Sequence, residues 1–182
     1  LGVAAEDARD FSLSGCHEVI VTGRAQMGAV EGFINLPKLL RVVLGLEPGV
    51  RPGPDLASLD SFDKLWAALE DAFDFAAQGA HEFSLDRDRQ QAGIPGGILA
   101  ASLVTNDCIE NCLGYTQGGA RYNFCNWDAI GIANLADSLA AIQRLVYGEQ
   151  ALTLAELAEV LRANWAGHEP LRRRLLNRLP HF

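Results

Sequence analysis

A thiol and a carboxylate lie two residues apart near the start of the chain, in the stretch Ser14-Gly15-Cys16-His17-Glu18. The β-branched residues that follow favour an extended backbone, and side chains alternate along such a backbone. Cys16 and Glu18 are therefore expected to face one side of the segment and His17 the other. A thiol and a carboxylate in one small cavity can act together, whereas an isolated cysteine beside apolar residues is usually a small buried hydrophobe.

A glycine-rich run and a helix start follow this motif at short spacing. Residues 22–28 read Thr-Gly-Arg-Ala-Gln-Met-Gly, and Asn35-Leu36-Pro37-Lys38 offers a capping residue and a proline where a helix can begin. Together with the Gly-Cys-X-Glu motif, these features resemble the cysteine-loop region of the glycyl radical enzymes, the pyruvate formate-lyase-like family. The Gly-Cys-X-Glu form is similar to the dehydratase, decarboxylase and C–N or C–S lyase branches of that family.

Downstream segments extend the resemblance in the order expected for this family. Cys108-Ile109-Glu110, residues 118–123 and residues 133–147 resemble the core that follows the cysteine loop. The helix around residues 152–157 and the final Leu-Pro-His-Phe also have family counterparts. Because the match covers nearly the whole chain in order, the chain is identified as a member of the glycyl radical enzyme family.

The resemblance implies an α/β fold, a partial segment of a ten-stranded α/β barrel that is mostly helical, with a few strands and a cysteine-bearing loop. Residues 1–182 are expected to be part of one catalytic barrel domain, with the cysteine loop at 12–34 and the helical and strand remainder at 35–182. The Arg-Val-X-Gly-Tyr-like loop that carries the family's glycyl radical does not occur in the sequence. We therefore expect an internal segment of a longer protein that is inactive alone.

The resemblance also assigns roles to the motif residues. Cys16 would lose its hydrogen atom to the glycyl radical, and the resulting thiyl radical would take a hydrogen atom from a substrate carbon. Glu18 would accept a proton from the substrate hydroxyl or carboxyl group, which assists elimination or decarboxylation. His17 and Phe33 are weaker candidates for contact with the substrate. The loop after the motif offers Glu31 and no obvious Asp, which argues against simple diol dehydration.

By the same resemblance, this segment binds no cofactor and no metal, and the full-length enzyme carries a protein glycyl radical installed by a radical-SAM activating enzyme. The expected partners are a small-molecule substrate, that activating enzyme, the remainder of the barrel and, in the complete protein, a second copy in a homodimer. The alternative is a truncated or remnant chain that is not catalytic and serves only as a structural or interaction module.

Two other kinds of site fit the residue types less well. A Cys-His-Glu hydrolase needs a base within hydrogen-bond reach of the sulfur, and adjacent side chains on a strand diverge, so Cys16 and His17 form a poor dyad. A metal or iron–sulfur site at Cys108, Cys112 and Cys125 would have three thiols without a firm fourth ligand, whereas buried structural cysteines need none.

The composition argues against several classes of partner. The 182 residues carry a net charge of -8 and are 49% hydrophobic, which suits a packed core but not nucleic acid or an anionic membrane as the main partner. No apolar run approaches the roughly 20 residues of a membrane span, and no signal-peptide pattern is present. A chain of this size needs no disulfides, so we expect a cytoplasmic protein with reduced thiols.

The elements that must position the motif are mainly helices. Apolar residues at helical spacing, with caps and stop signals, predict helices over residues 36–44, 62–76, 82–91, 130–147, 154–165 and 169–179. Gly79 is the predicted stop between the second and third, and Thr153 with Glu156 forms a capping box before the fifth. The stripe that includes Trp66 and Phe73 is expected to pack in the core.

The remaining segments are shorter. Residues 4–11 read as one or two helical turns that lead into the cysteine motif, and residues 23–32 read as a glycine-rich loop. Residues 98–104 fit either a strand or a buried helical turn, since periodicity does not separate the two. The double glycine at 118–119 permits close backbone approach, and the Tyr-Asn that follows fits a strand.

Overall fold

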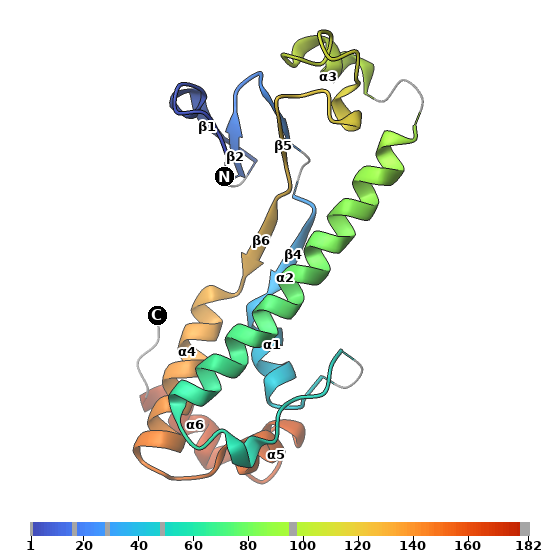
Figure 1. Ribbon diagram of the computed structural model, residues 1–182. Helices are drawn as coiled ribbons and strands as arrows, with labels where there is room; N and C mark the ends of the chain where they lie inside the picture. Colours follow the sequence, from blue (N-terminus) through green and yellow to red (C-terminus); the bar gives the residue numbers. More distant parts are fainter. Residues whose placement is uncertain (1, 16–17, 28–29, 48–49, 95–97, 179–182) are drawn as a thin grey trace. The chain divides into compact units, whose positions relative to one another are not determined.

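The computed structural model describes residues 2–15, 18–27, 30–47, 50–94 and 98–178. They fall into two compact units, one formed by Leu1–Phe33 with Ala77–Asp128 and the other by Ile34–Ala76 with Ala129–Phe182. The chain passes from one unit to the other within strands β4 (Gly32–Asn35) and β6 (Trp127–Ile130) and within helix α2 (Phe62–Ala92), which Figure 1 labels. Membership of all residues in one barrel domain stays a prediction.

The first unit opens with a hairpin that follows a short helix. The 3-10 helix η1 (Asp7–Asp10) leads directly into strand β1 (Phe11–Ser14), which pairs antiparallel with β2 (Glu18–Val21). The register runs from Phe11 opposite Val21 to Ser14 opposite Glu18. The helical turn and the extended segment after the cysteine motif are therefore confirmed.

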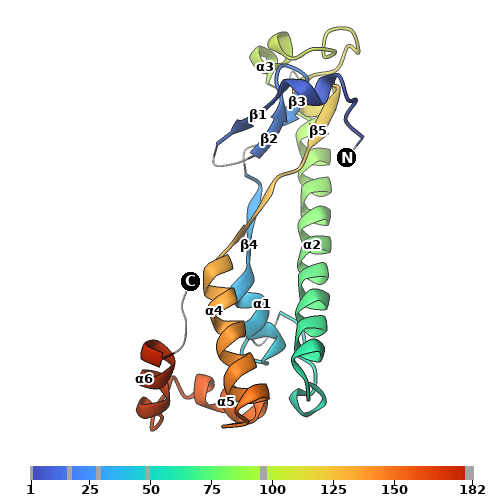
Figure 2. The ribbon, with the colours of Figure 1, turned by 90° about the vertical axis from the view of Figure 1, so that its left-hand side faces the viewer.

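Two further strand pairs join segments that are far apart in the sequence. Strand β3 (Ala25–Met27) pairs in parallel with β5 (Tyr122–Phe124), and β4 pairs with β6; Figure 2 shows β3 beside β5. The strand expected after the double glycine is thus confirmed. The loop predicted over residues 23–32 is wrong, because that stretch contains β3 and the first residue of β4.

Gly119 shows why the double glycine is needed before β5. A Cβ atom at this position would lie 2.1 Å from the carbonyl oxygen of Leu113, which is closer than real Cβ atoms approach backbone. Only glycine therefore allows the two backbone segments to come together.

Residues 98–104 form helix α3 (Leu99–Val104) rather than a strand, and Leu99, Leu103 and Val104 are exposed among the described residues.

Helix α2 is one continuous element of 31 residues, so the predicted stop at Gly79 is wrong. A stripe of buried residues at helical spacing continues past the glycine. Leu65 and Leu69 precede Gly79 in the sequence, and Ala80 and Ser84 follow it. A mid-helix glycine costs about 1 kcal/mol relative to alanine, which burial of such a stripe readily offsets. Within the predicted stripe, Trp66 (45% exposed) and Phe73 (40%) lie partly in solvent, so their core assignment is wrong.

The second unit is a helical cluster around one apolar core. Its elements are α1 (Leu36–Val43), the 3-10 helix η2 (Leu56–Ser58), the first part of α2, α4 (Ile132–Ile142), the π-helix η4 (Gln143–Gly148), α5 (Leu154–Arg162) and α6 (Glu169–Arg178). The core is aliphatic and includes Leu40, Val43, Leu44, Leu65, Leu69, Leu139, Ile142, Val146, Leu154 and Leu157. Burial of these side chains is the main stabilising contribution to this unit.

Local capping signals fix two of these helix starts as expected. The Asn35 side chain accepts a hydrogen bond from the Lys38 N–H at 3.1 Å, and Thr153 and Glu156 form the predicted capping box. The helix predicted over 130–147 begins later, because residues 127–130 form β6 and Gly131 turns the chain with φ +81°. A Cβ at Gly131 would meet the Pro37 ring at 2.6 Å, so that turn also requires glycine.

Among the described residues, none of the helices has the length and apolar character that crossing a membrane requires.

Candidate functional site

The cysteine motif lies where the hairpin turns from β1 to β2. Cys16 and His17 are outside the described residues, so their predicted directions stay predictions. Gly15, the last described residue before them, has a φ of +57°, a conformation that favours glycine. Glu18, the first residue after them, begins β2 and is only 7% exposed. The acid predicted to work with the cysteine is therefore a buried side chain on a paired strand.

The Glu18 carboxylate folds back over Gly15. Its Oε2 and Oε1 atoms lie 2.5 and 2.6 Å from the point where a Cβ of residue 15 would be. Any side chain at position 15 would displace the carboxylate, so the glycine of Gly-Cys-X-Glu serves both the turn and the acid. The acid is thus held against the residue that directly precedes Cys16 in the sequence.

Phe33, the weaker substrate candidate, lies on β4 and is 60% exposed. Its role in contact with a substrate stays a prediction. Its neighbour Gly32 is tightly packed, because a Cβ there would lie 2.2 Å from the ring of Trp127.

Glu31 is held by helix α2 and is not a free acid in the loop. Its side chain is 0% exposed, and Oε1 lies 2.6 Å from Nη1 of Arg87. Among the described residues Oε1 accepts no hydrogen bond, so the attraction to Arg87 is one of charge. Oε2 accepts a hydrogen bond from the hydroxyl of Ser84. Sequence reasoning identified Glu31 as an acid but missed both partners, which lie more than fifty residues away.

Ser84 connects Glu31 to the segment that leads into β6. A serine hydroxyl has one proton to donate, which goes to Glu31, and its oxygen accepts from Trp127 Nε1 at 3.0 Å and from Cys125 Sγ at 3.1 Å. Cys125 must then carry its proton to act as donor. Loss of hydration at the sulfur is the main cause that raises the pKa of Cys125, which agrees with a neutral thiol even though the residue as a whole is exposed.

The other described cysteines do not gather around a common centre. Cys108 is buried, and loss of hydration raises the pKa of its thiol, whereas Cys112 is exposed. Within the described ranges, no group of three His, Cys, Asp or Glu side chains is arranged to hold a metal ion.

Two solved structures resemble this chain over nearly its whole length. It superposes on the glycerol-bound form of the B12-independent glycerol dehydratase from Clostridium butyricum with a TM-score of 0.82 and 26% identity, covering 100% of this chain and 23% of that one. It superposes on a glycyl radical enzyme from Archaeoglobus fulgidus with a TM-score of 0.75 and 27% identity, covering 99% and 23%.

Sequence comparison identifies the family. The family model described as pyruvate formate lyase-like matches residues 1–182, and the chain belongs to that family. The chain is 32% identical over 178 residues to (2S)-3-sulfopropanediol dehydratase of Klebsiella oxytoca, covering 93% of this chain and 21% of that protein. It is 29% identical over 196 residues to trans-4-hydroxy-L-proline dehydratase of Clostridioides difficile, covering 100% and 24%. The chain thus spans between a fifth and a quarter of the length of these relatives.

Proposed function

We propose that this chain is the cysteine-bearing part of a glycyl radical lyase that acts on a small polar substrate. Cys16 carries the thiyl radical that abstracts hydrogen from a substrate carbon, and Glu18 is the base that assists elimination or decarboxylation. The observation that carries the proposal is the buried Glu18 carboxylate held over Gly15, directly beside the cysteine in the sequence. Relatives with dehydratase, sulfite-lyase and decarboxylase names support the reaction class.

The proposed reaction balances around the two motif residues. A glycyl radical in the complete protein would supply the one-electron chemistry, and the Cys16 thiol is the group that would give up a hydrogen atom to it. The sulfur radical then takes a hydrogen atom from the substrate carbon, which re-forms the S–H bond and leaves the radical on carbon. In an elimination, Glu18 accepts the proton of the adjacent hydroxyl group and the leaving group departs with its electron pair. In a decarboxylation, Glu18 accepts the carboxyl proton, CO₂ departs without the bonding electron pair, and Glu18 returns its proton to the carbon. The product radical recovers a hydrogen atom from Cys16, and the sulfur radical formed in this step would recover its hydrogen atom from the glycine.

Burial of Glu18 suits this role in two ways. A carboxylate with few water contacts is a stronger base toward a bound substrate, and a dry site protects a radical from side reactions. Phe33 is retained as a weaker candidate for a wall of the substrate site, and His17 as a second. Glu31 is not proposed as a substrate contact, because Arg87 and Ser84 already bind its two carboxylate oxygens.

The strand pairs support a larger barrel around this segment. Parallel sheets occur almost only with both faces covered and with several strands, whereas β3 and β5 form a parallel pair of two among the described residues. Phe11, Leu13 and Val19 of the hairpin are each more than half exposed. We therefore propose that the remainder of a ten-stranded barrel covers these elements in the complete protein, which would act as a homodimer activated by a radical-SAM enzyme.

The test uses the complete protein, activated anaerobically, with the substrates named for its relatives as a panel. Cys16→Ser is expected to abolish turnover while the glycyl radical signal still forms, because the serine hydroxyl holds its hydrogen too strongly to act as relay. Cys112→Ser is the matched control, since Cys112 is exposed and outside the motif. Turnover by the Cys16→Ser variant, or turnover by the wild-type protein without any radical, would contradict the radical role. Absence of both radical and turnover in the wild-type protein after activation would favour the non-catalytic alternative.

A further inference from the structure

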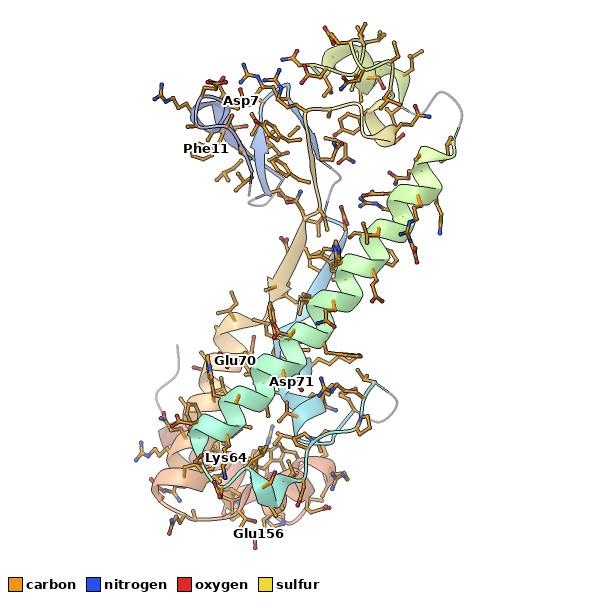
Figure 3. All side chains as sticks on the ribbon, viewed as in Figure 1. Asp7, Phe11, Lys64, Glu70, Asp71 and Glu156 are labelled. Carbon is orange, nitrogen blue, oxygen red and sulfur yellow. The ribbon has the colours of Figure 1, made fainter. Side chains whose placement is uncertain are left out.

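Asp7 is a buried carboxylate at the base of the hairpin that carries the cysteine motif. It is the first residue of η1, only 4% exposed, and it lies at the start of the element that leads into β1 (Figure 3). A buried charge is costly unless cationic or hydrogen-bonding groups surround it. The partners of Asp7 therefore determine what its burial achieves.

Three side chains from two other parts of the first unit converge on this carboxylate. The Tyr122 hydroxyl donates to Oδ2 at 2.7 Å, and Arg121 Nη1 donates to the same oxygen at 3.1 Å. Arg24 Nη1 lies 3.1 Å from Oδ1. Arg121 and Tyr122 lead into and begin β5, and Arg24 lies between β2 and β3. The Asp7 carboxylate thus links the segment before β1, the segment after β2 and the start of β5.

The cations around Asp7 are themselves fixed by other acids. Arg24 Nη1 also contacts Asp10 Oδ2 at 2.9 Å, and Arg121 donates to both oxygens of Asp107, at 2.7 and 3.2 Å. The Tyr122 hydrogen bond is the largest cause that lowers the pKa of the Asp7 carboxyl, with further lowering from Arg121 and Arg24. Asp7 is therefore an ionised acid in a cage with little freedom to rotate.

The cage is connected to Glu18 through the hairpin ladder. Thr22 N–H donates to the Asp10 carbonyl at 3.3 Å at the open end of the hairpin, and four residue pairs lead from there to Ser14 opposite Glu18. Tyr122 N–H donates to the Arg24 carbonyl at 3.0 Å where the β3–β5 pair begins. A change in the angle of the hairpin base would therefore move the Glu18 carboxylate.

We propose that Asp7 is a positioning residue that orients the β1–β2 hairpin so that Glu18, and the cysteine motif it belongs to, meet the substrate correctly. This inference rests on the proposed function, because it concerns the geometry of that reaction. A misplacement of about 1 Å at a reacting group can cost on the order of 100-fold in rate. Asp7 touches neither the substrate nor the reacting atoms.

The principal variant is Asp7→Asn in the complete, activated protein, with Glu6→Gln as the matched control. Glu6 is the preceding residue, is exposed and carries the same charge, but none of the described residues forms an ion pair with it. Asp7→Asn is expected to lower kcat about 10- to 100-fold with KM within about 2-fold of wild type and unchanged glycyl radical content, measured by electron paramagnetic resonance. Glu6→Gln is expected to match wild type in all three.

A second variant guards against simple loss of folding. Tyr122→Phe removes the hydrogen bond to Asp7 and the one that the hydroxyl accepts from the Ala4 N–H, and it leaves every charge in place. It is expected to give the same pattern with a kcat loss of about 3- to 10-fold. If Asp7→Asn and Glu6→Gln have equal kcat and Cys16→Ser is inactive, the positioning role is overturned and the proposed function stands. The positioning role is also overturned if folded fraction, radical content and kcat fall in parallel in both Asp7→Asn and Tyr122→Phe. If Cys16→Ser itself turns over substrate, the proposed function fails first.

Discussion

At the scale of single residues, the proposed chemistry depends on how closely a carboxylate approaches a backbone. Glu18 occupies the space that a side chain of residue 15 would need. Its burial and its pairing opposite Ser14 limit the positions that the acid can take. If Glu18 is the base that we propose, this restriction reduces the entropy that it loses on meeting a substrate.

Replacement of the acid separates its proposed role from that of the cysteine. Glu18→Gln in the complete protein is expected to keep hydrogen exchange between substrate carbon and solvent through the thiol. Elimination should fall by about 10²- to 10⁴-fold, the usual contribution of a general base. Deuterium incorporation and product formation are measured on the same sample. Unimpaired product formation would remove Glu18 from the role of base.

The contacts of the Glu31 side chain could not be predicted from the sequence. The motif Gly-Cys-X-Glu can be read locally, since its residues are adjacent. The contacts of Glu31 with Ser84 and Arg87 depend on how α2 packs, and a lone Ser on a helix gives no signal of its own. Asp7 likewise gives no signal of its own within residues 4–11, because its partners Arg121 and Tyr122 are more than a hundred residues away.

At the scale of elements, local signals predicted two helix starts and the strands β2 and β5, but not the short strand β3. Asn35 and Thr153 cap α1 and α5 as expected, because a cap is defined by residues three apart. Strand β3 has three residues and pairs with β5 nearly a hundred residues away, so no periodicity marks it. The break expected at Gly79 fails because buried residues on both sides keep the helix continuous.

The glycine in α2 offers a direct gain in stability. A Cβ at position 79 would meet nothing within 4 Å, and the residue is in ordinary helical conformation within α2. Gly79→Ala is therefore expected to raise the free energy of unfolding by about 0.5–1 kcal/mol, measured by chemical denaturation. Gly119→Ala is the contrasting variant and should destabilise, since its Cβ would collide with the Leu113 carbonyl. A loss of stability in Gly79→Ala would contradict this account of the helix.

The capping box of α5 predicts an acid-dependent loss of stability. Hydrogen bonds from the Thr153 N–H and hydroxyl lower the pKa of Glu156 below its ordinary value of 4.5. The contribution of the Glu156 carboxylate to the free energy of unfolding is therefore complete above pH 4.5. It is lost as the pH falls through the pKa of Glu156 in the folded state. Glu156→Gln should remove this part of the pH dependence. The measurement is the free energy of unfolding in urea, at neutral and at acidic pH. Glu159→Gln, in the same helix but outside the cap, should retain it.

At the scale of the whole molecule, membership of the pyruvate formate lyase-like family is shown, and the sequence motifs predicted it correctly. The motifs could do so because they occur in order over nearly the whole chain. The same motifs do not reveal how many further strands the proposed barrel has, since this chain spans about a fifth to a quarter of the length of the relatives that it matches.

Hydrogen exchange can measure how far the strands depend on the rest of such a protein. In this chain produced alone, amides of β5 are expected to exchange much faster than amides of α4 and α5, because a two-stranded parallel pair has few neighbours and the helices share an apolar core. In the complete protein, β5 should become protected by its added neighbours. Equal protection of β5 in both proteins would show that the strand pair needs no further sheet.

The close contact between Gly15 and Glu18 has a consequence for anyone who redesigns this site. Any residue larger than glycine at the first position would force the carboxylate at the second to move, and the positive φ of Gly15 would also strain the backbone of that residue. A design that keeps the acid in its present place therefore has to carry the bare backbone of position 15 with it.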